Sequence, residues 1–221
     1  MSQPRRAVFE YSPLFLLCVH KGGSTFIAQH LFPSLAKLDD RLTVYPIDRK
    51  YIDWYHDVKA QRGWQSTNDT QELNRRLREM LNEFPIPDAG ALISRFYPRQ
   101  IDAVRDYYGG QFPPASSRLF VMRRDPRDAL ISLYYSKAFS HNPKAFQTVT
   151  DRLDTQRSRM KEQGVYGWIH QALSDSKPLP MFDEFRTCAE VLQSDRDAID
   201  LPYELLIEDS GQWLSRFVEA A

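Results

Sequence analysis

The chain has no excess of charge of one sign, few cysteines and no long apolar run, and each shortage excludes a class of protein. Its 29 basic and 29 acidic side chains leave a formal net charge of zero. No broad positive field therefore attracts nucleic acid, and any phosphate binding must come from local geometry. The two cysteines, Cys18 and Cys188, cannot build a disulfide framework, so we expect two buried free thiols in a reducing compartment.

The lack of any apolar run of about 20 residues excludes a transmembrane helix. The N-terminus places Arg5 and Arg6 ahead of the apolar residues 14–19, an arrangement that superficially looks like a signal peptide. Glu10 interrupts this pattern, the apolar run is short, and Lys21 stands where a cleavage site needs small residues. We expect a cytoplasmic protein without a membrane span.

What the sequence does contain is the composition of a globular protein: 42% hydrophobic, 13% aromatic and 26% charged residues over 221 positions. No internal repeat or low-complexity tract divides the chain, so we predict one domain over residues 1–221. Strands that alternate with helices predict a parallel α/β sheet in three layers. The expected strands cover residues 14–19, 41–48, 89–96 and 118–122. The expected helices cover residues 26–35, 69–84, 99–108, most of 137–198, and 211–221, with breaks in the long helical region near 142–143, 164 and 178–180. Residues 51–63 show no clear period.

The most informative segment is the short loop from Lys21 to Thr25, which follows the first apolar run and precedes a helix. Its two glycines let backbone N–H groups approach an anion closely, and the start of the helix adds further N–H groups. The hydroxyls of Ser24 and Thr25 add donors, and Lys21 adds a positive charge. In a Walker A loop, G-x-x-x-x-G-K-[ST], the lysine follows the glycines, whereas here Lys21 precedes Gly22 and Gly23. The loop predicts a phosphate site, but not that of an ordinary nucleoside triphosphatase.

A second strand-to-helix segment runs from Leu119 to Ser132. Asp125 is a suitable N-cap, and Pro126 suits the first helical position. Arg124 leaves the strand just before this helix, where its planar guanidinium fork suits a phosphate monoester. This segment therefore predicts a second phosphate contact.

Together the two segments resemble the sulfotransferases that use 3′-phosphoadenosine-5′-phosphosulfate. That family carries P-K-S-G-T-T-W after its first strand, which grips the 5′-phosphosulfate; this chain carries H-K-G-G-S-T-F at residues 20–26. The family then carries R-N-P-K-D and a serine eight residues after the arginine, which grip the 3′-phosphate; this chain carries R-D-P-R-D at residues 124–128 and Ser132 at the same spacing. A third match, residues 200–209, resembles the short strand and Y-E-D-L segment that closes the sheet in the family. The resemblance covers residues 14–35, 117–136 and 199–219.

The resemblance implies a sulfotransferase fold like that of P-loop nucleoside triphosphatases, and an enzyme that moves a sulfuryl group to an acceptor hydroxyl or amine. Lys21 would stabilise charge on the departing adenosine 3′,5′-bisphosphate, and no metal is expected. Arg124 and Ser132 would hold the 3′-phosphate, whereas Arg123 and Arg127 are expected to be solvated or ion-paired. The other implied cofactor-binding residues are Gly22, Gly23, Ser24, Thr25 and Phe26.

Attack on sulfur also needs a base that takes the proton of the acceptor. Cytosolic family members supply a histidine in K-T-H-L-P, but the nearest equivalent here, residues 94–98, has Phe96 in that place. Other branches use a glutamate after the second strand, and Asp48 stands near that location with His56 close behind. Asp48 and His56 are therefore the candidate catalytic bases, with His20 in the loop as a further candidate.

The acceptor is left open as a small molecule, a carbohydrate or a lipid. The aromatic segments 51–55 and 134–135 are candidates for lining an aromatic or sugar site, although such clusters more often form core. The family's late F-R-K-G-x-x-G segment, which covers the cofactor, has no counterpart in this sequence. We expect either that the chain is truncated and lacks this cover or that another segment covers the adenosine.

Two other functions stay open. The first is a P-loop kinase or nucleoside triphosphatase with a degenerate loop, which would bind ATP with magnesium. The second is a nucleotide-binding protein without catalytic activity, which the missing histidine and the missing cover both favour. Binding of the bisphosphate without turnover would identify the second.

Overall fold

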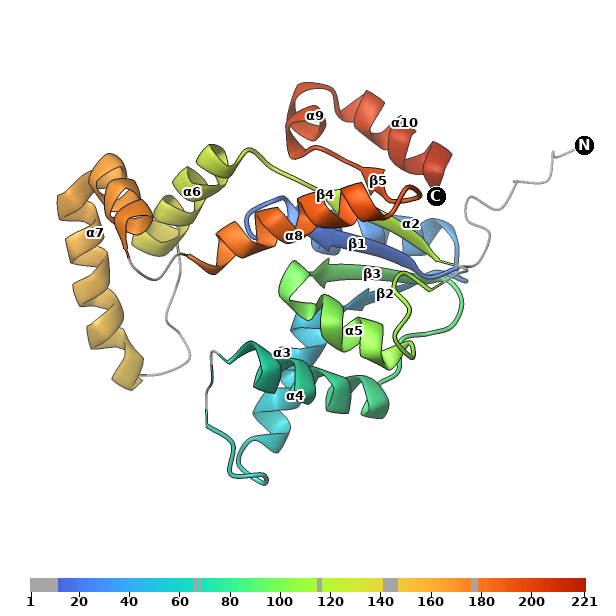
Figure 1. Ribbon diagram of the computed structural model, residues 1–221, viewed down its shortest axis with the longest axis horizontal. Coiled ribbons are helices and arrows are strands. Elements are labelled where there is room, and N and C mark those ends of the chain that lie inside the picture. The colour runs from blue at the N-terminus through green and yellow to red at the C-terminus, as the bar shows by residue number, and fades with distance from the viewer. Residues whose placement is uncertain (1–11, 66, 68, 115–116, 141–146, 176–178) are drawn as a thin grey trace, which may run out of the picture.

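The computed structural model describes residues 12–65, 67, 69–114, 117–140, 147–175 and 179–221. Its centre is a five-stranded sheet in the order β2-β3-β1-β4-β5, with every pairing parallel (Figure 1). The predicted α/β class and parallel sheet are confirmed. The strands are β1 (Leu14–Cys18), β2 (Thr43–Pro46), β3 (Ala91–Phe96), β4 (Arg118–Met122) and β5 (Ile199–Asp200).

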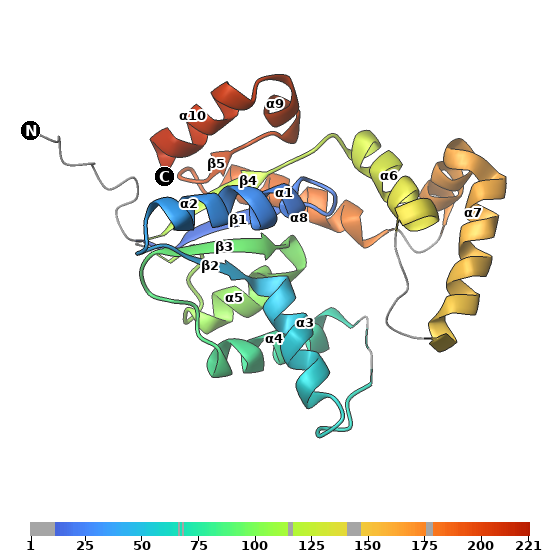
Figure 2. The same cartoon turned by 180° about the vertical axis from the view of Figure 1, so that it is seen from behind.

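Helices cover both faces of this sheet, which explains why the central strands are apolar throughout. Every residue of β1 is buried, and Arg118 is the one exposed residue of β4. Figure 1 and Figure 2 show the two helical layers from opposite sides. One face packs against α1 (Ser24–Phe26), η1 (the π-helical turn Ile27–Leu31), α2 (Phe32–Leu38) and α10 (Ser210–Ala220); the other packs against α3 (Ile47–Val58), α4 (Thr70–Glu83), α5 (Ile101–Tyr107) and α8 (Pro180–Ser194).

A further apolar cluster lies beside the sheet, where α6 (Pro126–Tyr135), η3 (Ser136–Ser140) and α7 (Gln147–Ser174) meet the start of α8 (Figure 1). Tyr134 and Trp168 are buried in it. The backbone of α7 is interrupted at Gly164, where φ is 67°, as the predicted break required. The predicted break near 178–180 is also confirmed, because α7 ends at Ser174 and α8 begins at Pro180. The break predicted at 142–143 lies outside the described residues.

The second predicted strand was too long, and the helix after it was missed. β2 ends at Pro46, and α3 follows immediately with Asp48 in its first turn, where a carboxylate is favourable. Ile47 and Trp54 are the buried residues of α3. This narrow buried stripe explains why residues 51–63 show no obvious helical period.

The other expected helices are present with small shifts. The 99–108 prediction corresponds to the 3-10 turn η2 (Pro98–Gln100) and α5, and α9 (Tyr203–Glu208) precedes α10. None of the helices in the described residues is long and apolar enough to cross a membrane.

The strand order brings the two predicted motifs to the same place. The connection after β1 runs to β2 at one edge of the sheet, and the connection after β4 runs to β5 at the opposite edge. In open α/β sheets, ligands bind beyond the carboxyl ends of neighbouring strands whose connections diverge in this way. The loop of residues 19–23 follows β1, and the segment 123–125 follows β4, so both lie at this switch point.

Candidate functional site

The loop after β1 is tightly packed and has an uncommon backbone conformation. Lys21 has φ 65° and Gly23 has φ 91°, both in the left-handed region that costs a residue with a side chain about 1–2 kcal/mol. A Cβ on Gly22 would lie 2.8 Å from Val19 Cγ2, and one on Gly23 would lie 2.9 Å from Met122 Cε. Both glycines are therefore required by the close packing of the loop against the protein.

The polar groups of this loop are divided between internal bonds and the surface. The N–H of Gly22 donates to the carbonyl oxygen of Val19 at 2.9 Å, so the expected phosphate contact of this amide is not available in this conformation. Ser24 is buried, with its Oγ 3.2 Å from the hydroxyl of Tyr97. Thr25 and Phe26 are exposed in the first helical turn, where backbone N–H groups have no acceptor within the helix.

Arg124 joins the second motif to the first. Its Nη1 donates to the carbonyl oxygen of Lys21 at 2.8 Å, and its guanidinium lies 4.5 Å above the ring centre of Tyr203. Its Nε is buried and has no hydrogen-bond partner among the described residues. The guanidinium is thus fixed at the switch point with a donor left over for a ligand.

The neighbouring arginines have carboxylate partners, as the sequence predicted. Arg123 forms a two-pronged ion pair with Asp200, and Arg127 pairs with Asp125. Asp125 also accepts the N–H of Arg127 at 2.8 Å, which confirms its predicted role as the N-cap of α6. Arg124 is therefore the arginine of this segment whose charge is left unneutralised by the described residues.

Three cations gather at the switch point: Lys21, Arg124 and Lys137. Burial lowers the pKa of Lys21, and the charges of Arg124 and Lys137 lower it further. Burial also lowers the pKa of Lys137. No carboxylate of the described residues forms an ion pair with any of the three. Such a group of partly buried positive charges favours an anionic ligand.

The serine that contacts this group is not the one predicted. Ser132 is half-buried in α6, and its hydroxyl makes no hydrogen bond to another described residue. Ser136 lies one turn later and accepts a hydrogen bond from Lys21 Nζ at 2.6 Å. Positions four apart share a helix face, and this relation was the available signal for Ser136. The role of Ser132 at a 3′-phosphate stays a prediction.

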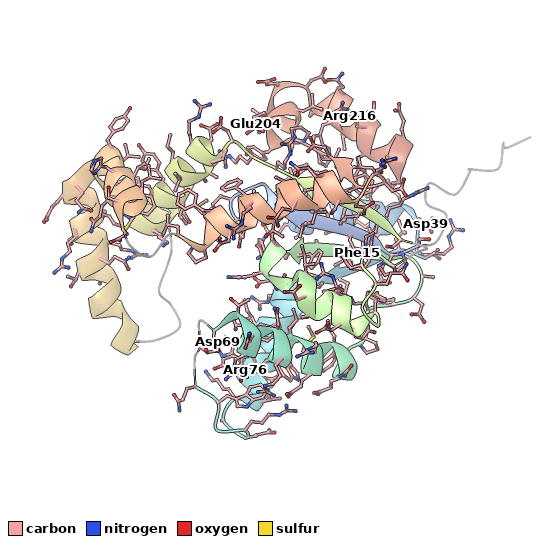
Figure 3. All side chains as sticks on the ribbon, viewed as in Figure 1. Phe15, Asp39, Asp69, Arg76, Glu204 and Arg216 are labelled. Atoms are coloured by element: carbon pink, nitrogen blue, oxygen red, sulfur yellow. The ribbon has the colours of Figure 1, made fainter. Side chains whose placement is uncertain are left out.

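The third matched segment does more than close the sheet. β5 pairs with β4 as expected, but the N–H of Tyr203 also donates to the carbonyl oxygen of Arg123 at 2.7 Å. The Oε1 of Glu204 accepts the N–H of Asp125 at 2.7 Å, and Figure 3 labels Glu204 beside the segment that joins β4 to α6. This segment therefore positions Arg124 from two sides, a role that the sequence did not reveal.

Two carboxylates lie on the β3 side of the loop. Glu184 on α8 is 4% exposed, and its Oε2 accepts the N–H of His20 at 2.7 Å. Arg99 Nη2 lies 3.8 Å from Oδ1 of Asp48. Burial raises the pKa of both carboxyl groups, and the positive charge of Arg99 lowers both. The charge of Asp48 raises the pKa of Glu184 further. Glu184 was missed because α8 contributes it from a distant part of the chain.

The structure separates the predicted bases. Asp48 and His56 stand eight residues apart on α3, which places them about 12 Å apart along the helix axis. His56 is exposed near the end of α3, with Nδ1 3.3 Å from Lys59 Nζ. Phe96, in the place of the family's histidine, is a fully buried core residue. Of the two predicted bases, Asp48 alone lies near Glu184 and Arg99.

Two adjoining cavities open beside these carboxylates. The larger, about 830 Å³, is lined by Arg99 of η2 and Glu184 of α8 among others. The smaller, about 320 Å³, is lined by Asp48 and Tyr51. They share Thr70, Leu73 and Arg99. The aromatic segment 51–55 thus lines a cavity through Tyr51, whereas Tyr134 is part of the core.

In comparisons with known proteins, no family model, curated protein or solved structure matches this chain.

Proposed function

We propose that the protein transfers a sulfuryl group from 3′-phosphoadenosine-5′-phosphosulfate to an acceptor hydroxyl or amine. The observation that carries this proposal is the group of three cations at the switch point, which have no carboxylate partner among the described residues, with Arg124 bonded to the carbonyl oxygen of Lys21. The two matched motifs are about a hundred residues apart in sequence, yet the hydrogen bond of 2.8 Å from Arg124 to Lys21 connects them directly. A ligand with two separate phosphate groups fits such a pair of adjoining anion sites.

The residues present suit the two ends of this donor. Lys21 and the first-turn amides of the exposed residues Thr25 and Phe26 would hold the phosphosulfate end, where positive charge stabilises the departing phosphate. The buried Nε of Arg124 lacks a partner among the described residues, and a dianionic 3′-phosphate would supply one. Catalysis then depends on positioning and electrostatics, as in phosphoryl transfer.

The position of Lys21 favours this donor over ATP. Lys21 precedes the glycines, and its ammonium is held by Ser136 of η3, whereas a Walker A lysine follows its glycines and reaches the β- and γ-phosphates. We therefore expect selectivity for a nucleotide with a 3′-phosphate.

A thermal-shift screen tests this proposal directly. Adenosine 3′,5′-bisphosphate, AMP, ADP and ATP with magnesium are compared at equal concentration. At a hundredfold excess over Kd, bound ligand stabilises the fold by about 2.7 kcal/mol, which corresponds to roughly 5–10 °C in Tm for a chain of this size. We expect a shift of this size with the bisphosphate and a clearly smaller one with the others. A larger shift with ATP and magnesium would favour a kinase or nucleoside triphosphatase.

A further inference from the structure

One lining residue of the larger cavity, Glu184, contacts the loop that carries Lys21. Glu184 lines this cavity and is bonded through Oε2 to the N–H of His20. His20 and Lys21 are consecutive, so their Cα atoms lie about 3.8 Å apart. Oε1 of Glu184 has no hydrogen bond to a described residue. A molecule in the cavity would therefore meet a carboxylate that is hydrogen-bonded to the loop carrying Lys21.

We propose that Glu184 is the general base of this site and that the larger cavity receives the acceptor. This inference rests on the proposed sulfuryl transfer. As the acceptor oxygen or nitrogen bonds to sulfur, its proton passes to Oε1 of Glu184. The bond between sulfur and the bridging phosphate oxygen breaks, and adenosine 3′,5′-bisphosphate leaves with the electron pair. A proton acceptor at this point raises the nucleophilicity of the attacking atom.

The surroundings of Glu184 raise the pKa of its carboxyl group, which suits a general base. Burial raises the pKa of its carboxyl group, as does the charge of Asp48 on α3, while the His20 N–H and the charge of Arg99 on η2 lower it. The thiols of Cys18 on β1 and Cys188 on α8 also face this carboxylate. A carboxylate whose pKa is raised accepts a proton more readily than an exposed one.

Glu184 is better placed than the bases suggested by sequence. Asp48 faces Arg99 and lines the smaller cavity. His56 is exposed and lies about 12 Å further along α3 than Asp48. Glu184 is the carboxylate bonded to the loop itself, one residue before Lys21.

The test measures transfer to 2-naphthol, 2-phenylethylamine and glucosamine across pH 4.5–8.5, a range around the ordinary pKa of a carboxyl group. Glu184→Gln keeps an oxygen for the His20 N–H, and Glu162→Gln, on the exposed surface of α7, is the matched control. We expect Glu184→Gln to lower kcat by about 10²–10⁴-fold and to remove the fall in rate at low pH. Affinity for adenosine 3′,5′-bisphosphate should stay within about twofold, since the phosphate-binding groups are untouched. Glu162→Gln should behave as wild type.

Two further variants separate catalysis from structure. Asp48→Asn should keep the fall in rate at low pH but move it to lower pH, because it removes a charge that raises the pKa of Glu184. Glu184→Asp should move the fall in transfer rate at low pH to a different pH. This variant tests whether Glu184 is the base if Glu184→Gln does not fold. Three results would each overturn the role of Glu184. The first is an unchanged kcat in Glu184→Gln, and the second is a loss of bisphosphate affinity in that variant as large as its loss of kcat. The third is a wild type that binds the bisphosphate but transfers to none of the three acceptors. Absence of bisphosphate binding by the wild type would instead overturn the proposed function.

Discussion

Lys21 is the side chain on which the proposed chemistry depends most directly. It has a left-handed backbone conformation, a bond to Ser136, and two other cations as neighbours. Lys21→Ala removes the charge that would stabilise the leaving phosphate, so we expect kcat to fall by about 10²–10³-fold. Alanine meets the same left-handed constraint as lysine, so Tm should change little.

Transfer to 2-naphthol and thermal unfolding, measured on the same preparations, check this expectation. Lys37→Ala, in the last turn of α2, is the matched control and should keep full activity. A Lys21→Ala enzyme that works at the wild-type rate would show that this ammonium does not stabilise the departing group.

At the scale of elements, the turn between β1 and α1 requires two glycines for different reasons. Gly22 lies against Val19, whereas Gly23 has a positive φ and lies against Met122 and Tyr203. Because Tyr203 also packs under Arg124, a side chain at Gly23 would disturb both the loop after β1 and the segment after β4.

Gly23→Ala tests this coupling between the two segments. The matched control is Gly63→Ala, where φ is also positive at 63° but no atom lies within 4 Å of the added Cβ. We expect the control to lower the free energy of unfolding by about 1–2 kcal/mol, and Gly23→Ala to lower it by a further 1–3 kcal/mol, roughly, because of overpacking. Chemical denaturation measures both. Equal losses would mean that the loop can relax away from Met122 and Tyr203.

Local signals in the sequence were sufficient for some elements and not for others. An apolar strand, a glycine turn and the Asp125–Pro126 start signal are short-range patterns, and they predicted β1, β4 and α6 closely. α3 escaped prediction because its buried stripe is narrow. Glu184 could not be predicted, since its contact with the loop joins residues 164 positions apart, and Ser136 was signalled only by its spacing of four residues from Ser132.

At the scale of the whole molecule, the zero net charge hides a local separation of charge. Three cations gather where the loop meets the β4 side, and Asp48 and Glu184 lie on the β3 side, where the charge of Arg99 acts on both carboxyl groups. A donor that carries phosphate and an acceptor that loses a proton would need these two environments side by side.

The buried carboxylate should also affect the pH dependence of stability. Burial raises the pKa of Glu184 above its ordinary value of 4.5, so its contribution to stability is full below that pH and is lost as pH rises through the folded-state pKa. Glu184→Gln removes this loss. We expect the variant to match wild type at about pH 4 and to become the more stable of the two towards pH 7, as linkage requires.

Thermal unfolding of wild type and variant at pH 4, 5, 6 and 7, spanning the ordinary carboxyl pKa, measures this effect. Glu162→Gln, exposed on α7, should show no such pH-dependent difference from wild type. A constant difference between Glu184→Gln and wild type at all four values would contradict a raised pKa for Glu184.

Calorimetric titration with adenosine 3′,5′-bisphosphate and with AMP tests the assignment of the donor most directly. A charge-assisted bond to the 3′-phosphate contributes about 1.5–3 kcal/mol, so the wild type should bind the bisphosphate at least about tenfold more tightly than AMP. Arg124→Ala should remove most of that difference and leave the affinity for AMP nearly unchanged. Arg123→Ala should preserve the difference, because Arg123 is paired with Asp200. Equal affinity of the wild type for the two nucleotides would contradict the assignment of 3′-phosphoadenosine-5′-phosphosulfate as the donor.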